Sequence, residues 1–267
     1  MSVNPPRVLR GAGGLLVSLA VILAVWQGFL WAFQVSPFVG KGPVAVWSYL
    51  VSGPGAGSHL ATLGRQSVVT LRDAMLGLVA GTVAAAVSAV AFNLWRPLEQ
   101  TLMPVAIVLR AVPLVAMTPL IVLMFGRDLA AVAVIAGIVT FFPALVNITL
   151  ALRSAPREPL DVCRAYGAGR VATMWKVQVP VALPALFASL RIASPLALVG
   201  ALLAEWLATG TGLGYQILEA AAVSDYTGLW ATVAVTTAYS LALYAVIGAV
   251  EARVLRRLGF GPRESDP

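Results

Sequence analysis

Few side chains in this sequence could do nucleophilic, redox or metal chemistry. The 267 residues include one histidine, His59, and one cysteine, Cys163. These counts exclude an internal disulfide and the usual zinc clusters of several His and Cys ligands. The remaining candidates are charged residues inside apolar stretches and one patterned, charged loop.

ATP chemistry would need a phosphate-binding loop, in which a glycine precedes Gly-Lys-[Ser/Thr] by four residues and backbone N–H groups hold the phosphates. Lys41 is followed by Gly42 and Lys176 is preceded by Trp175, so neither lysine fits this pattern. If ATP drives this protein, we expect another chain to bind the nucleotide.

Three ionisable residues, Arg110, Arg191 and Glu205, lie inside apolar stretches. Such groups usually face a bundle interior or water, which favours a translocation path with Pro113 at a bend and Glu205 near an outer gate. Residue 205 follows residue 191 by about four helical turns, which predicts that both lie on one helix face. In the alternative interpretation the arginines cap helix ends or bind backbone carbonyls, and Glu205 anchors a Gly-rich outer loop.

The elements that position these residues are apolar helices. The chain is 60% hydrophobic and 11% charged, with a mean hydropathy of +0.90, which indicates a polytopic membrane protein. About 20 apolar residues cross a bilayer as a helix. Six stretches qualify, and they predict an all-α fold forming one transmembrane domain over residues 1–267: 14–33, 68–92, 102–125, 129–151, 182–207 and 229–250. The first has no small-residue cleavage site, so we interpret it as a retained span rather than a signal peptide.

Basic residues indicate how the chain is oriented, because Lys and Arg concentrate in cytoplasmic loops. With the N-terminus inside, the outer segments hold only Lys41, Arg65 and Arg127. The inner segments hold Arg7, Arg10, Arg96, Arg153, Arg157, Arg164, Arg170, Lys176, Arg253, Arg256, Arg257 and Arg263. We therefore expect both termini in the cytoplasm. So few charges cannot form a continuous phosphate-binding face, which excludes nucleic acid as the reason for the net charge of +7.

The inner segment 152–181 is long, charged and patterned. Pro159 suits the first turn of a helix, Glu158 and Asp161 favour its N-terminal dipole, and Gly167 and Gly169 suit its end. The segment therefore predicts a helix of about two turns lying along the membrane surface. An ordinary amphipathic loop helix is the alternative to a docking element.

This loop resembles that of permease subunits of binding-protein-dependent ABC importers, in which E-A-A, three residues and Gly precede a Leu-Pro-like ending. The matching positions here are Asp161-Val162-Cys163, Gly167 and Val179-Pro180, so Asp, Val and Cys replace the family's Glu and two alanines. The resemblance implies that a short coupling helix fits a cytoplasmic ATPase dimer, which carries the ATP and Mg²⁺. It assigns coupling to Glu158, Asp161, Val162, Cys163, Ala165, Tyr166, Gly167, Ala168 and Pro180.

Residues 43–257 are similar to the branch that imports nitrate, sulfonates, taurine, bicarbonate and thiamine-precursor pyrimidines. The resembling stretches are 41–47, 109–114 with 118–120, 141–147, 190–193 and 212–215. The resemblance implies a bacterial-type plasma (inner) membrane, a second and identical permease copy, and an extracytoplasmic solute-binding protein. It favours a sulfonate- or nitrate-like anion as the substrate, with a pyrimidine vitamin precursor or another small neutral nutrient as the alternative.

Smaller signals predict local structure. Gly77 and Gly81 form a G-x-x-x-G pattern typical of close helix packing. Short helices are expected at 43–50 and 217–223, and Pro104, Pro113 and Pro119 can bend the third span.

Two other classes of protein would account for the sequence differently. A self-sufficient secondary transporter or channel would need ion-coupling residues and internal repeats, and neither is clear. A membrane enzyme would have to use Glu205, Asp225 or Cys163, but no close acid–base pair supports it, and His59 falls in an outer loop rather than beside Cys163.

Overall fold

The computed structural model describes residues 7–258, and every regular element in that range is helical. Residues 1–6 and 259–267 lie outside this range, and with them Arg263, one of the basic residues on which the predicted orientation rests. The helices are α1 (Arg7–Ala32), α2 (Pro43–Trp47), η1 (Ser48–Ser52), α3 (Ala56–Leu94), α4 (Arg96–Arg110), α5 (Leu114–Phe125), α6 (Leu129–Arg153), α7 (Arg157–Ala165), α8 (Arg170–Thr173), η2 (Met174–Gln178), α9 (Val179–Ala204), η3 (Glu205–Thr209), α10 (Gly212–Ala222) and α11 (Tyr226–Arg257). The all-α prediction is confirmed.

Within residues 7–258, four helices are long and apolar enough to cross a membrane: Ala56–Leu94, Leu129–Arg153, the continuous run Arg170–Thr209, and Tyr226–Arg257. A fifth span is possible if the bent pair α4 and α5 counts as one. The first predicted span lies in α1, whose apolar part Val17–Ala32 is shorter. The polytopic membrane fold is therefore present, with longer helices than the apolar stretches alone predict.

The predicted third span, 102–125, is not a straight helix. Helices α4 and α5 meet at an angle of 106°, so this segment is either a broken span or a re-entrant loop. Pro113 stands immediately before α5, in extended backbone, whereas Pro104 and Pro119 lie inside the two helices. A proline disfavours helical geometry in the residue before it, so Pro113 explains why the helix is broken immediately before this position.

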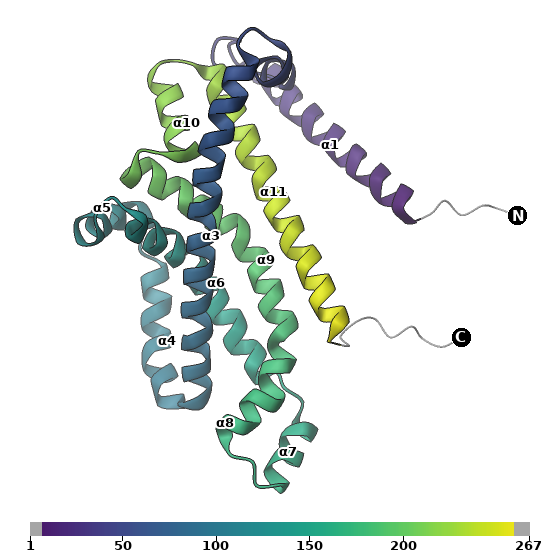
Figure 1. Ribbon diagram of the computed structural model, residues 1–267, viewed down its shortest axis with the longest axis vertical. Coiled ribbons are helices and arrows are strands. Elements are labelled where there is room, and N and C mark those ends of the chain that lie inside the picture. Colours follow the sequence, from purple (N-terminus) through teal and green to yellow (C-terminus); the bar gives the residue numbers. More distant parts are fainter. Residues whose placement is uncertain (1–6, 259–267) are drawn as a thin grey trace, which may run out of the picture. The chain divides into compact units, whose positions relative to one another are not determined.

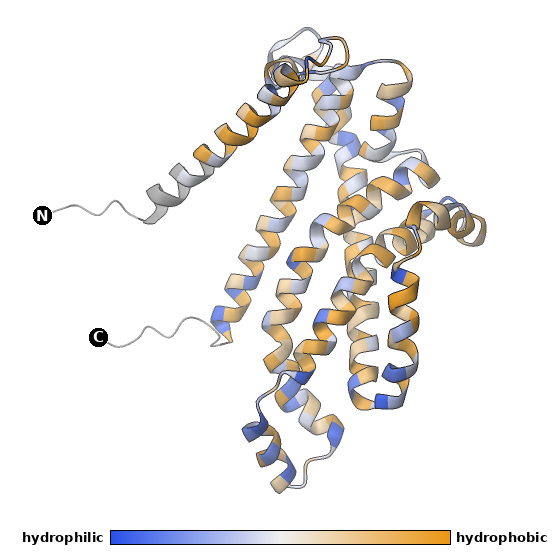
Figure 2. Ribbon diagram, turned by 180° about the vertical axis from the view of Figure 1, so that it is seen from behind, coloured by the Kyte–Doolittle hydropathy of each residue, from blue (hydrophilic) through white to orange (hydrophobic). Residues whose placement is uncertain are grey.

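The chain forms two compact units, which we describe separately: residues 65–216 with the chain from 236 onward, and residues up to 64 with 217–235. In the larger unit α3, α6 and α9 are long neighbouring helices, with α4 beside the end of α3 (Figure 1). Hydrophobic residues follow these helices along most of their length, while hydrophilic ones gather on α7 and at the turn between α3 and α4 (Figure 2).

Glycines allow the helices of this unit to touch. A Cβ at Gly77 would overlap Ala136 of α6, and a Cβ at Gly81 would overlap Thr140. The Thr140 hydroxyl donates to the Gly77 carbonyl at 3.0 Å, a bond between helices that only close approach permits. On α9, Gly200 packs against the same Ala136. The G-x-x-x-G pattern is therefore a packing device, as predicted.

The smaller unit is held by aromatic side chains. Trp26 of α1 stacks on Trp230 of α11 with ring centroids 5.5 Å apart, and the Trp230 indole donates to the Val39 carbonyl at 2.8 Å. Tyr49 stacks on His59 at 3.8 Å between ring centroids. The predicted short helix at 43–50 is present as α2 and η1.

Asp225 has a structural role in this smaller unit. One carboxylate oxygen accepts the Gly228 N–H at 2.9 Å and so caps the first turn of α11, while the other accepts the Tyr49 hydroxyl at 3.2 Å. Burial, together with the nearby Asp225 carboxylate, raises the pKa of Tyr49 to about 12. These contacts account for the residue without a catalytic role.

Candidate functional site

The charged loop after α6 forms the predicted short helix, α7. Beyond its end Gly167 adopts φ 74°, a left-handed conformation that glycine favours. The N–H groups of Gly167 and Ala168 bond to the carbonyls of Arg164 and Cys163, both at 2.9 Å. This is the Schellman arrangement, which fixes where the helix stops and the direction in which the chain leaves it.

Helix α7 buries none of its side chains against the rest of the described chain. No α7 residue is buried, Val162 is 56% exposed and the adjoining Tyr166 is 88% exposed. Glu158, Asp161, Ala165 and Gly167 are also exposed, whereas Cys163 and Ala168 are half-buried. The ion pair between Asp161 and Arg164, at 3.2 Å, is exposed and contributes little to stability. The helix therefore presents an uncovered aliphatic and aromatic surface.

After Gly169 a long helix begins earlier than the predicted stretch 182–207. The run Arg170–Thr209 is continuous, so Pro180 lies inside a helix instead of ending a loop. The five residues Met174–Gln178 before it form a π-helical turn, and Met174 is buried there. This wider turn comes just before Pro180, which lacks an N–H group. An irregularity in the helical hydrogen bonds is expected at such a position.

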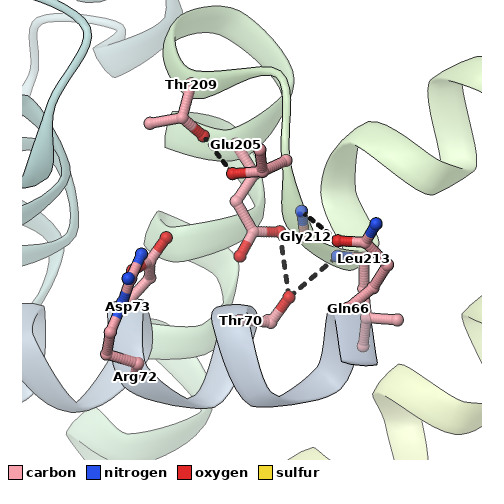
Figure 3. Close-up of polar contacts among 9 residues, drawn as sticks. Gln66, Thr70, Arg72, Asp73, Glu205, Thr209, Gly212 and Leu213 are labelled. Atoms are coloured by element: carbon pink, nitrogen blue, oxygen red, sulfur yellow. Dashed lines mark hydrogen bonds and ion pairs between the residues drawn. The ribbon is translucent and has the colours of Figure 1, made fainter. Parts of the chain in front are cut away.

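Glu205 at the start of η3 is fully buried and connects three segments. Its Oε2 accepts the Thr70 hydroxyl of α3 at 3.0 Å and the Gly214 N–H of α10 at 2.8 Å. The Thr70 hydroxyl in turn accepts the Leu213 N–H at 2.8 Å. Figure 3 shows the Glu205 carboxyl pointing at α3, with Gln66 reaching the Gly212 N–H one turn away, at 2.8 Å.

The Gly-rich loop is shaped around this carboxyl group. Gly212 has φ 86°, and a Cβ there would overlap the Glu205 carboxyl group, so the loop tolerates only glycine at that position. A Cβ at Gly214 would overlap the Leu202 carbonyl. We call Gln66, Thr70, Glu205 and the N–H groups of 212–214 the clasp. The contacts of the clasp agree with the alternative interpretation of the sequence, in which Glu205 anchors the Gly-rich loop.

Span α3 carries two charges that the sequence analysis missed. Asp73 is fully buried, and its Oδ1 lies 2.8 Å from the guanidinium of Arg72. Among the described residues its Oδ2 has no hydrogen-bond partner, and neither has Oε1 of Glu205. Both residues fall within the predicted stretch 68–92, so applying to it the same test for intramembrane charges would have found them.

Arg191 is paired rather than free. Its guanidinium lies 3.3 Å from Oε2 of Glu251 and 5.4 Å from the ring centroid of Tyr244, both on α11. A cluster that includes Ala197 and Ala201 packs α9 against both α3 and α11. The arginine therefore helps to hold α11, a partner that the sequence did not suggest.

Arg110 is the last residue of α4, at the 106° break, and is exposed. Within residues 7–258 no ion pair to it is found. Pro113 is exposed on the other side of the break. Of the four residues predicted for a path, these two lie beside one another, whereas Arg191 and Glu205 contact helices α11 and α3.

Comparison with known proteins shows which family and which relatives this chain is similar to. Residues 77–259 match the family described as binding-protein-dependent transport system inner membrane component. The riboflavin transport system permease protein RibX of Chloroflexus aurantiacus is 32% identical over 247 residues, covering 91% of this chain and 89% of that protein. The putative aliphatic sulfonates transport permease protein SsuC of Bacillus subtilis is 28% identical, covering 92% and 84%.

One solved structure shares the fold. The MetNI methionine ABC transporter in an inward-facing conformation includes a chain that superposes with a TM-score of 0.64 at 20% identity. The match covers 75% of this chain and 98% of that one.

Proposed function

The chain belongs to the family of binding-protein-dependent transport system inner membrane components, and from this premise we propose that it is the transmembrane subunit of an importer driven by a separate ATPase. The observation that carries the proposal is α7, a short capped helix whose aliphatic and aromatic surface is left uncovered by the described part of the chain. Exposed apolar surface of this kind usually marks a protein contact. ATP and Mg²⁺ would bind to the partner, and this chain would do no covalent chemistry.

Docking at α7 would transmit ATP-driven closure to the spans because the loop is stiff at both ends. The Schellman turn holds the end of α7, and helix Arg170–Thr209 continues from the loop without a break. A rigid-body shift of α7 would therefore move α9 rather than be absorbed in a flexible linker. We propose that this movement switches the spans between outward- and inward-open states.

Co-purification with the ATPase subunit tests the docking surface. Tyr166→Ala should weaken the complex by roughly 30-fold or more, because buried tyrosines at interface centres often contribute about 2 kcal/mol or more. Leu258→Ala, which truncates an exposed apolar residue at the end of α11, serves as the matched control. Equal retention of the ATPase by both variants would rule out α7 as the docking site.

We propose that the translocation path passes the break between α4 and α5. Arg110 is an exposed cation there without an acidic partner in the described part of the chain, and it supports a small anion as substrate. For Arg191 and Glu205 the observed partners support structural roles beside the path. Arg110→Gln should lower transport with ATPase docking intact, whereas Arg127→Gln, in the exposed turn before α6, should not.

The substrate class we propose is a sulfonate- or nitrate-like anion, as in the relative named for aliphatic sulfonates. The RibX relative favours a second candidate, a neutral heterocyclic nutrient related to vitamins. ATPase activity of the complex with its solute-binding protein, measured with sulfonates, nitrate, riboflavin and a pyrimidine, would separate them. Stimulation by a heterocycle alone would reject the anion.

The assembly we propose has two copies of this chain, two ATPase subunits and an extracytoplasmic solute-binding protein. Both termini would face the cytoplasm, consistent with the basic residues of the loop 152–181 and of the end of α11. Cysteine labelling from either side of sealed vesicles would test this orientation.

A further inference from the structure

A polar pocket of about 490 Å³ lies between the turn joining α3 to α4 and the loop that carries α7 and α8. Four arginines line it: Arg96, Arg153, Arg164 and Arg170. No acidic side chain is part of the lining. The pocket therefore concentrates positive charge.

Two of these arginines are already neutralised. Arg153 pairs with Glu99 of α4, and Arg164 pairs with Asp161. Arg96 and Arg170 have no acidic partner among the described residues. Two positive charges thus remain uncompensated, at the ends of helices on opposite sides of the pocket, which suits a ligand with one or two negative charges.

The rest of the lining can also bind oxygen atoms. The Asn93 amide donates to the Gln178 amide oxygen at 2.8 Å, so these two side chains form a fixed polar wall. Thr173 adds a hydroxyl group. Guanidinium, amide and hydroxyl donors around one space are the groups that bind phosphate oxygens.

The location points to a lipid. The α3–α4 turn and the α7–α8 loop lie at the same end of the larger unit (Figure 1). Trp95, next to the pocket, and Trp175 are each more than half exposed, as is typical of aromatic residues at the headgroup level of a bilayer. The first turn of α4 beside the pocket is polar, and exposed apolar residues follow along the helix from Leu102 and Val105 to Ile107 and Val108. A headgroup in the pocket could keep its acyl chains beside α4.

We propose that this pocket binds the phosphate group of an anionic phospholipid from the cytoplasmic leaflet. The assignment to that leaflet rests on the proposed orientation of the chain. Basic pockets between membrane helices on the cytoplasmic side bind such headgroups in general. A phosphate between Arg96 and Arg170 would connect the α3–α4 turn to the loop of α7, so bound lipid would stiffen the element proposed to couple ATP hydrolysis to transport.

Native mass spectrometry of the full permease–ATPase complex tests the binding. The probe is phosphatidylglycerol added to delipidated complex in detergent, with phosphatidylcholine and inorganic phosphate as separate arms. Arg96→Gln with Arg170→Gln should weaken phosphatidylglycerol binding about 25-fold, taking about five-fold for each arginine at a membrane surface. Arg96→Lys with Arg170→Lys should retain most binding, and Arg257→Gln, an exposed arginine outside the pocket, should not change it.

Three results would overturn the proposal. Equal losses in the glutamine pair and in Arg257→Gln would indicate non-specific surface attraction. Binding of inorganic phosphate with the same arginine dependence, and no preference for lipid, would assign the pocket to a free phosphate. Lipid bound to the permease without the ATPase, but absent from the full complex, would show that the partner fills the pocket. Because the mass readout needs neither transport nor ATP hydrolysis, a failure here would leave the proposed transport function intact, and a transport failure would leave this binding measurable.

Discussion

Replacing Glu205 by alanine should open the Gly-rich loop before α10. The carboxyl oxygen Oε2 is the acceptor for both the Thr70 hydroxyl and the Gly214 N–H. Removing it deletes two hydrogen bonds and leaves the Gly214 N–H buried without an acceptor. Glu205→Gln keeps an oxygen at the same place and so keeps both bonds.

The size of the effect follows from these contacts. A lost hydrogen bond costs about 1 kcal/mol, and a buried donor without a partner costs about 1–3 kcal/mol more. For Glu205→Ala the sum is about 3–5 kcal/mol of local stability, and its lower end corresponds to a roughly 150-fold larger open fraction of the loop. For Glu205→Gln we expect less than about 10-fold.

Cysteine labelling measures this opening directly. Leu213 is fully buried, so Leu213→Cys in a Cys163→Ala background should react with a membrane-impermeant maleimide only when the loop opens. The labelling rate should rise with Glu205→Ala and stay near the starting value with Glu219→Ala, an exposed acid on the same helix α10. No acceleration in Glu205→Ala would refute the clasp. Equal acceleration by Glu205→Gln would show that the charge matters rather than the acceptor.

Three further substitutions have defined outcomes. Gly81→Ala places a methyl group against the neighbouring helix and should cost about 1–3 kcal/mol, seen as a lower thermal unfolding midpoint in detergent, whereas Gly64→Ala, with open space around it, should be neutral or slightly stabilising. Gly167→Ala strains a left-handed position by about 1–2 kcal/mol and should reduce substrate-stimulated ATPase activity of the complex; Gly169→Ala, an extended position with open space, should not. Because the pKa of Tyr49 is raised to about 12, its neutral form stabilises the fold at lower pH. This stability should be lost as the pH rises from 10 to 12, so the unfolding midpoint should fall less steeply in Tyr49→Phe; identical curves would contradict that role.

The short helix α7 and its end could be predicted from the sequence because the signals for them are local. Pro159 and Glu158 in the first turn and Gly167 after the last one act through their own backbone and the nearest peptide dipoles. The exit at Pro180 could not be read in the same way. The π-helical turn Met174–Gln178 precedes the proline and the helix continues past it. The Met174 side chain in that turn is buried, so the turn depends on tertiary packing.

By itself the sequence determined that the chain is helical and spans a membrane, that G-x-x-x-G brings helices together, and that no phosphate-binding loop is present. These properties depend on composition and short-range spacing. The thickness of the hydrocarbon layer sets how long an apolar helix must be, and the helix itself satisfies the backbone hydrogen bonds there. Tertiary structure decided the 106° break, the pairing of Arg191 with Glu251, and the burial of Glu205 between Thr70 and Gly214. A charge inside a membrane requires a partner, but residues 135 positions apart in the chain become partners only when helices pack. For that reason the sequence could place Glu205 in a span, while only the fold could show that it closes a loop.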